Sequence, residues 1–227
     1  MASIAENIST VRDQITKAAT RSGRAADSVT LLAVTKTQTP QKLREAYSAG
    51  QREFGENYVQ EALAKIQSLD LPDLVWHFIG PIQSNKTADI ATHFDWVHSV
   101  DRLKIASRLS SQRPEGLPPL NICVQVNLSH EDSKSGMALE DTAALCEQIA
   151  KLPRLRLRGL MAIPAPCVGY AQQRAVFAPL ALLFRELQGR FEKLDSLSIG
   201  MSADYEAAIA EGSTIVRVGS AIFGARD

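Results

Sequence analysis

The sequence has few cysteines, no long apolar run and no excess of charge of either sign. Three cysteines occur among 227 residues, at Cys123, Cys146 and Cys167. Their odd number and wide spacing exclude a disulfide framework and a zinc signature. The polar N-terminal stretch does not resemble a signal peptide, and no run of about 18 apolar residues could cross a bilayer. We therefore expect a cytoplasmic protein with no membrane partner.

The charges balance, since 25 Lys and Arg residues oppose 25 Asp and Glu residues. A general nucleic-acid binder would carry a basic field, so nucleic acid is not an expected partner. The sequence also lacks a Gly-x-Ser-x-Gly elbow, a Walker loop and a dinucleotide fingerprint. Its four histidines are dispersed without metal-ligand spacing, so no metal site is predicted. A local anion site is compatible with all of these features.

Apolar, strand-like segments alternate eight times with helical segments, after an amphipathic first helix over residues 4–19. The expected strands span 29–35, 52–54, 74–80, 94–100, 121–128, 155–163, 194–200 and 214–224. This alternation predicts an α/β protein with a parallel sheet covered by helices. A count of eight favours a closed (β/α)8 TIM barrel over an open doubly wound sheet, whose Gly-rich first turn is missing. We expect one domain over 1–227.

Lys36 follows the apolar strand LLAVT, which would place it at the C-terminal mouth of the barrel, where functional groups gather. Partial desolvation there lowers the pKa of an amine and makes it nucleophilic, as Schiff-base formation requires. The alternative is a rim lysine whose ammonium group reaches into water.

Ser202 follows the seventh expected strand, and Gly219 lies in the segment Arg217-Val218-Gly219-Ser220 of the eighth, where it would let the backbone approach a ligand closely. The ends of strands seven and eight, with the loops after them, form the recurrent phosphate site of this architecture, and helix N-termini there favour anions. Ser202 could instead simply cap the next helix, and Gly219 could be a plain turn residue.

Three further polar residues lie in or after expected strands. Arg217, within VRVG, points either outward to an ion pair or toward the mouth to a ligand acceptor. Asn57 either lines the mouth or caps the following helix. His77 is typical of a hydrogen-bonded core or rim residue. A nucleophilic lysine and a phosphate cradle in one mouth fit pyridoxal 5'-phosphate (PLP), and they also fit the substrate of a phosphosugar aldolase.

Several blocks along the chain resemble the pyridoxal phosphate homeostasis protein family, whose fold is similar to the N-terminal barrel of alanine racemase. The blocks are LLAVTKTQTP (31–40), FGENYVQE (54–61), WHFIGPIQSNK (76–86), HSVDR (98–102), VQVNLSHEDSKSGM (124–137), LRGLMAIP (157–164) and LSIGMSADYEAAIAEGSTIVRVGSAIFGAR (197–226). The resemblance covers essentially the whole chain, in order and spacing.

The resemblance implies a PLP site in which Lys36 holds the cofactor as a reversible Schiff base and Arg217 faces the pyridine nitrogen. Ser202, Gly219 and Ser220 match the phosphate positions. The full set of implied cofactor-binding residues is Lys36, Asn57, Met201, Ser202, Arg217, Gly219 and Ser220.

The function implied by the resemblance is PLP homeostasis, in which the protein buffers PLP or delivers it to apo PLP-dependent enzymes. We expect a monomer without a complete catalytic set, because the relatives that racemise supply a tyrosine from a second domain and this sequence ends at Asp227. A weak PLP-dependent amino-acid racemase is the alternative. Lys134 is either a residue of cofactor hand-over or an exposed loop lysine.

Overall fold

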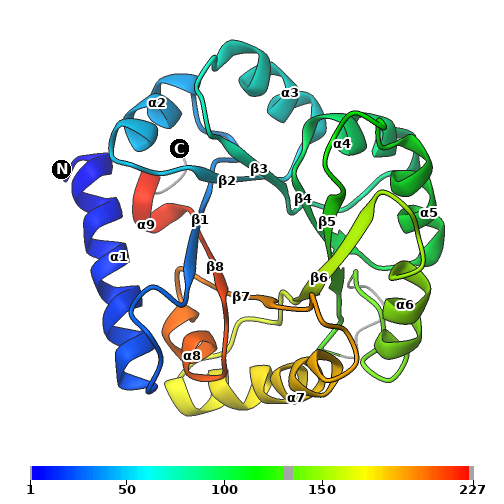
Figure 1. Cartoon of the computed structure of the whole chain (residues 1–227). Helices are drawn as coiled ribbons and strands as arrows, with labels where there is room; N and C mark the ends of the chain where they lie inside the picture. The colour runs from blue at the N-terminus through cyan, green and yellow to red at the C-terminus, as the bar shows by residue number, and fades with distance from the viewer. Residues whose placement is uncertain (1, 130–134, 225–227) are drawn as a thin grey trace.

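The computed structural model describes residues 2–129 and 135–224, and its strands form a closed parallel barrel surrounded by helices (Figure 1). Each strand pairs with the next along the chain, and β8 closes on β1. This confirms the predicted TIM barrel. The strands are β1 (Thr30–Val34), β2 (Glu53–Glu56), β3 (Val75–Phe78), β4 (Trp96–Val100), β5 (Leu120–Gln125), β6 (Leu155–Met161), β7 (Ser196–Met201) and β8 (Ile215–Val218).

Helices follow the strands and cover the outer face of the barrel, and an N-terminal helix lies beside α8 and α9 (Figure 1). They are α1 (Ile4–Arg21), α2 (Pro40–Ser48), α3 (Val59–Ser68), the 3-10 turn η1 (Ser84–Lys86), α4 (Thr87–His93), α5 (Leu103–Gln112), α6 (Thr142–Ile149), α7 (Tyr170–Gln188), α8 (Tyr205–Ala210) and α9 (Ser220–Phe223). None of these helices is long and apolar enough to cross a membrane.

The C-terminal segment differs from its prediction. The apolar run over 214–224 was expected to be one strand, but β8 ends at Val218 and residues 220–223 form the short helix α9. Gly219 is the N-cap of α9 and separates the two elements. An apolar run alone does not distinguish a buried strand from a buried helical turn, which explains the error. The consequence is that Ser220 lies at a helix start, at the mouth of the barrel.

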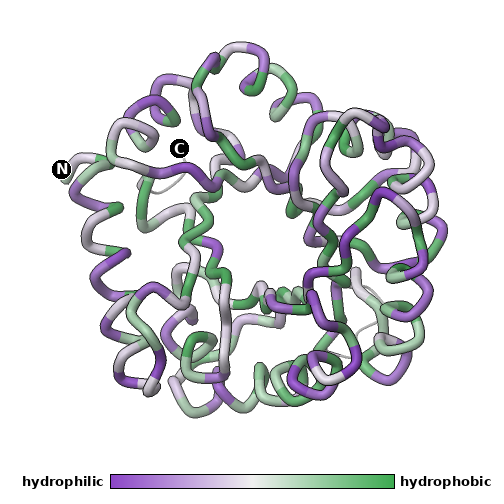
Figure 2. The backbone as a smooth tube through the Cα atoms, in the orientation of Figure 1, coloured by the Kyte–Doolittle hydropathy of each residue, from purple (hydrophilic) through white to green (hydrophobic). Residues whose placement is uncertain are grey.

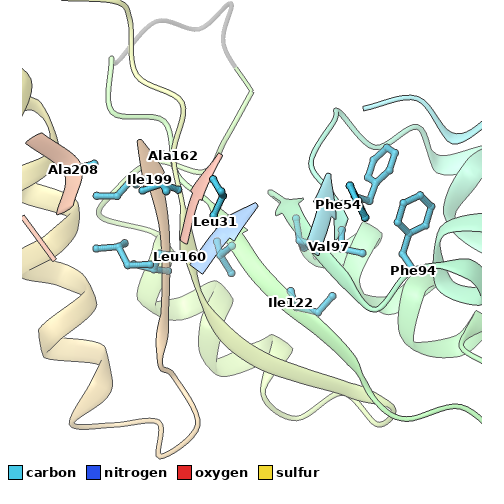
Figure 3. Packing of buried hydrophobic residues seen from close by; sticks show 14 of the residues in the cluster. Leu31, Phe54, Phe94, Val97, Ile122, Leu160, Ala162, Ile199 and Ala208 are labelled. Carbon is cyan, nitrogen blue, oxygen red and sulfur yellow. The ribbon is translucent and has the colours of Figure 1, made fainter. Parts of the chain in front are cut away.

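Apolar side chains form two separate clusters, on the two faces of the closed sheet. Leu31 and Ala33 belong to the large cluster between strands and helices, whereas Leu32 lies in a small cluster with Ile79 and Ile215. Alternate residues of a strand point to opposite faces, so the small cluster lies inside the barrel. Figure 3 shows part of the large cluster, with Ile199 of β7 beside Ala208 of α8. In Figure 2 the strands are largely hydrophobic, whereas hydrophilic and hydrophobic segments alternate along the outer helices.

The barrel interior also contains fully buried polar side chains. His77, His98, Ser198 and Arg217 are at most 3% exposed, and each comes from a different strand. Polar groups in such a place must be hydrogen-bonded to one another or to the backbone. The interior of this barrel therefore supports the mouth with a hydrogen-bonded network as well as with apolar packing.

Candidate functional site

Lys36 lies in a four-residue turn at the end of β1. The backbone N–H of Gln38 donates to Thr35 O at 3.0 Å and closes the turn around Lys36 and Thr37. Thr37 has a φ of 64°, a left-handed conformation that costs a β-branched residue energy. Leu32 faces the barrel interior, and the strand continues from it toward the mouth. The turn therefore places Lys36 at the mouth, where it is half-buried.

A buried lysine on α3 holds both sides of this turn. Lys65 is 3% exposed, and its Nζ donates to Thr35 O at 2.6 Å, to Glu56 Oε1 at 2.7 Å and to Glu61 Oε1 at 2.6 Å. On the other side of Lys36, Glu61 Oε1 accepts the backbone N–H of Thr37 at 2.5 Å. Lys65 thus bonds directly to the residue before Lys36 and, through Glu61, is connected to the residue after it.

Glu56 is the more deeply buried of the two carboxylates that bond to Lys65. It is 0% exposed, and burial raises the pKa of its carboxyl above the ordinary value while Lys65 and Thr35 act in the opposite direction. Thr35 Oγ1 donates to Glu56 Oε1 at 2.6 Å. Glu56 Oε2 is buried without a hydrogen-bond partner among the described residues. Lys65 is therefore the main group that keeps a carboxylate acceptable in this position.

Asn57 follows β2 at the same mouth and does not cap α3, whose N-cap is Tyr58. Its Oδ1 is buried without a hydrogen-bond partner among the described residues. The backbone of Asn57 lies so close to Gly80 that a Cβ there would meet Asn57 O at 2.1 Å. Asn57 also lines a cavity of about 300 Å³ together with Lys86. These observations favour a mouth-lining residue over a helix cap.

Ser202 and Ser220 meet across the ends of β7 and β8. Their Oγ atoms lie 3.4 Å apart. Ser202 does not cap α8, which begins later than predicted, at Tyr205, and whose N-cap is Asp204. Asp204 Oδ1 instead accepts the backbone N–H of Met201 at 2.6 Å and closes the loop that presents Ser202. The two hydroxyls form a donor pair suited to an anion.

Gly219 brings this pair against the strand that leads to Lys36. A Cβ at position 219 would lie 3.3 Å from Val34 O and 3.4 Å from Val34 Cβ, which is crowded. The absent side chain allows β8 to approach β1 closely at the level of the mouth. The structure therefore brings the lysine turn and the serine pair to one end of the barrel, as the sequence predicted.

Arg217 points into the barrel and not outward to an ion pair. Its Nη1 donates to Ser198 O at 2.6 Å and to Ser198 Oγ at 2.7 Å, and Nη2 donates to Ala162 O at 2.9 Å. Burial lowers the pKa of Arg217 to about 10, so the guanidinium stays charged at neutral pH. No salt bridge to it occurs within the described residues. A buried donor-only cation below the mouth fits a ligand with an aromatic nitrogen acceptor.

Sequence reasoning missed three contributors to this end of the barrel. His98 was taken as one of several dispersed histidines, yet His98 Nε2 lies 2.8 Å from His77 Nδ1. Ser198 and Lys65 were not singled out at all. The spacing of Glu61 and Lys65, four residues apart on a helix directly after Glu56, was the one available signal. Lys134 and His130 lie outside the described residues.

Together these features define a class: a (β/α)8 barrel whose mouth brings a lysine in the turn after strand one together with a pair of serine hydroxyls after strands seven and eight. The sequence model of the family "alanine racemase, N-terminal domain" matches residues 2–227. The pyridoxal phosphate homeostasis protein of Pseudomonas aeruginosa is 61% identical over 228 residues, covering 100% of this chain and 97% of that protein. The Escherichia coli (strain K12) protein of the same name is 56% identical over 230 residues, covering 100% and 98%.

Solved structures agree with these sequence relatives. PipY of Synechococcus elongatus with PLP bound is 41% identical, covers 97% of this chain and 100% of its own, and has a TM-score of 0.85. Alanine racemase from Corynebacterium glutamicum, at 15% identity and a TM-score of 0.68, shares the fold and covers 98% of this chain and 61% of its own. The chain belongs to the pyridoxal phosphate homeostasis protein family, within the alanine racemase N-terminal domain fold.

Proposed function

We propose that this protein binds PLP at the barrel mouth, as a reversible Schiff base on Lys36, and buffers or delivers the cofactor within the cell. The Nζ of Lys36 would supply the amine for this attachment, which would form with loss of water and be reversed by hydrolysis. PipY, which is 41% identical to this chain, has been solved with PLP bound. The observation that carries the proposal is the junction of the Lys36 turn and the serine pair through Gly219.

The described residues fit PLP in three places. Ser202 and Ser220 offer two hydroxyls, 3.4 Å apart, to the phosphate, with the backbone of Met201 and Gly219 alongside. Arg217 offers a buried cation to the pyridine nitrogen. Asn57 contributes an amide at the mouth whose Oδ1 lacks a protein partner among the described residues. Together with Lys36 for the aldehyde, this set matches the phosphate and ring-nitrogen chemistry of the cofactor.

Arg217 favours a carrier over an amino-acid enzyme. PLP promotes carbanion chemistry by acting as an electron sink, and protonation of its ring nitrogen strengthens the sink. A guanidinium at that nitrogen opposes protonation by charge repulsion. Because Arg217 stays charged at neutral pH, we expect weak carbanion chemistry and no efficient turnover. A weak racemase is the second candidate, favoured by the fold shared with alanine racemases.

An exchange experiment distinguishes the carrier from the racemase. PLP-loaded protein is incubated with single-enantiomer amino acids in deuterated water, and α-deuteration is followed by NMR. A carrier gives no exchange, or exchange limited to about one equivalent per site. Multiple-turnover α-deuteration would contradict the carrier function and establish the racemase.

The serine pair provides a test of the phosphate position. In the Ser202→Ala/Ser220→Ala double variant we expect PLP retention to fall by roughly thirtyfold or more, because two hydrogen bonds to a charged phosphate, of at least about 1 kcal/mol each, are lost. Folding should be unaffected, because Ser220 is exposed and Ser202 is partly exposed. Retention is measured by equilibrium dialysis, and the midpoint of thermal unfolding is the control. Unchanged retention would place the phosphate elsewhere.

The cellular setting follows from the same proposal. We propose one domain over 1–227, a monomer in the cytoplasm, and apo PLP-dependent enzymes as recipients. The three thiols are free, and burial raises the pKa of Cys123 and of Cys146 to about 12, which keeps both unreactive. Transfer of bound PLP to an apo-enzyme faster than release into solution would establish delivery, whereas transfer at the release rate would leave buffering alone.

A further inference from the structure

A chain of hydrogen bonds crosses the barrel interior beneath the proposed cofactor site. Arg217 Nη1 lies 2.7 Å from Ser198 Oγ, and Ser198 Oγ lies 2.8 Å from His98 Nδ1. His98 Nε2 then lies 2.8 Å from His77 Nδ1. The chain ends where His77 Nε2 lies 2.5 Å from Glu53 Oε2. Five residues from five strands are thus joined in one line.

The two ends of this chain differ in chemistry and in access to water. Arg217 is buried, whereas the side chain of Glu53 is 31% exposed. Glu53 is the first residue of β2, at the end of the barrel opposite the mouth, and it lines a cavity of about 440 Å³. The chain therefore links a buried cation below the mouth to an acidic residue that water can reach at the other end.

The direction of the donors follows from these ends. A guanidinium only donates, and an ionised carboxylate only accepts. Burial holds the pKa of His98 well below its ordinary value, with the charges of His77 and Arg217 acting in the same direction, so His98 is neutral with one N–H. We take His77 as neutral too, as part of the inference; every link then has one hydrogen only if Arg217 donates to Ser198, Ser198 to His98, His98 to His77, and His77 to Glu53.

Packing fixes the ring planes that this direction requires. Trp96 stacks on His77 with ring centroids 5.4 Å apart and planes at 7°. The guanidinium of Arg158 lies 4.6 Å from the Trp96 ring centroid on β4. Because the ring of His77 is held in place, both of its nitrogens stay aligned with their hydrogen-bond partners, His98 and Glu53.

We infer that Glu53, His77, His98 and Ser198 are positioning residues, which act as a one-directional relay that orients the Arg217 guanidinium toward the proposed cofactor. Ser198 Oγ accepts from Arg217 because its own hydrogen is committed to His98 Nδ1. The orientation of Arg217 thus depends on residues that never touch the mouth. The consequence for the cofactor rests on the proposed function, whereas the direction of the relay does not.

The direction is tested on the protein without PLP. Long-range ¹H–¹⁵N NMR correlations identify which ring nitrogen of each histidine carries the hydrogen. We expect the Nε2–H tautomer for both His77 and His98 at neutral pH. In His77→Phe, His98 Nε2–H loses its acceptor, so we expect the ¹⁵N resonances of both His98 and Arg217 to shift. A hydrogen on His98 Nδ1 in the wild type, or an unchanged Arg217 resonance in the variant, would overturn the relay.

The consequence for the cofactor is tested on the loaded protein. A phenyl ring at position 77 preserves the stacking on Trp96 but removes both nitrogens. We expect His77→Phe to release PLP about fivefold faster, equivalent to about one neutral hydrogen bond, and to shift the visible absorption band of bound PLP. The matched control is Phe78→Leu. Phe78 is the next residue of β3 and faces outward, with its ring centroid 5.3 Å from that of Phe94.

Phe78→Leu should destabilise the fold without changing the band or the release rate. Equal effects in the two variants would mean general loosening of the barrel and would overturn the relay. Wild-type release and band in His77→Phe would overturn it as well. If wild-type protein takes up no PLP at all, the proposed function fails, and the tautomers in the unloaded protein still decide the relay.

Discussion

Replacing Lys36 by alanine is expected to abolish covalent attachment of PLP. Lys36 lies in the turn at the mouth, and the proposed Schiff base needs its Nζ. Wild-type protein incubated with PLP and reduced with borohydride should gain the mass of one pyridoxyl phosphate group, on the tryptic peptide that contains Lys36. Lys36→Ala should gain none and should lose the yellow colour. Residual retention through the serine pair and Arg217 should be weaker by tenfold or more, about 1.4 kcal/mol.

Lys42→Ala is the matched control for this experiment. Lys42 lies on α2, one turn beyond the Lys36 loop, and its Nζ donates to Gln38 Oε1 at 2.9 Å. The Lys42→Ala variant should be labelled at Lys36 to the same extent as the wild type. Covalent attachment that persists in Lys36→Ala, or that maps to another lysine, would contradict the assignment of Lys36. A protein that takes up no PLP in any form would leave a Schiff-base aldolase acting on a phosphosugar as the better interpretation.

The fold was predictable because its signal is periodic. Eight short apolar runs separated by helical spacing define a barrel without any knowledge of contacts, and the strands fall where those runs lie. The errors lie at ends. Residues 220–223 continue an apolar run yet turn into α9, and α8 begins two residues later than expected. Ends depend on local hydrogen bonds, such as Asp204 accepting from Met201, which a hydropathy pattern does not contain.

The candidate site was predictable where it depends on strand ends. Lys36 and Ser202 each follow an expected strand, and parallel strands bring such residues to one edge. Ser220 was expected inside the strand over 214–224, and only the structure places it after β8. The supporting residues were not predictable, because they are side-chain contacts between distant strands. His98 of β4 and Ser198 of β7 are 100 positions apart and bond inside the barrel at 2.8 Å. Closure of the sheet creates that contact, and no local pattern encodes it.

Replacing Lys65 by methionine should destabilise the protein by about 3–5 kcal/mol, the effect of leaving a buried charge without its partner. Lys65 and Glu56 are 3% and 0% exposed and bond at 2.7 Å, and Lys65 also holds Thr35 O beside the Lys36 turn. Urea unfolding measures the change. Lys42→Met, which removes one partly buried hydrogen bond from Lys42 Nζ to Gln38 Oε1, should change the unfolding free energy by about 1 kcal/mol or less.

The pH dependence of the Lys65→Met variant identifies the cause of its instability. Burial already raises the pKa of Glu56, and Lys65 opposes that rise, so removing Lys65 raises the pKa further. A folded-state pKa above the unfolded value means that the folded protein binds a proton that the unfolded chain releases. Stability is therefore highest below the unfolded pKa and is lost as pH rises through the folded pKa. The variant should be closer to wild type at about pH 5 than at about pH 8.

A second substitution separates this charge effect from lost packing. In Lys65→Met/Glu56→Gln no buried carboxylate is left unpaired, so we expect recovery of at least about half of the loss and a flat pH dependence. A loss that is equal at both pH values and unchanged in the double variant would assign the role of Lys65 to packing alone. If the double variant regains stability but attaches less PLP than the wild type, the turn that contains Lys36 needs the Lys65 ammonium itself. The main role of the cluster of Lys65, Glu56 and Glu61 would then be to hold Lys36 in position, and its contribution to fold stability would be secondary.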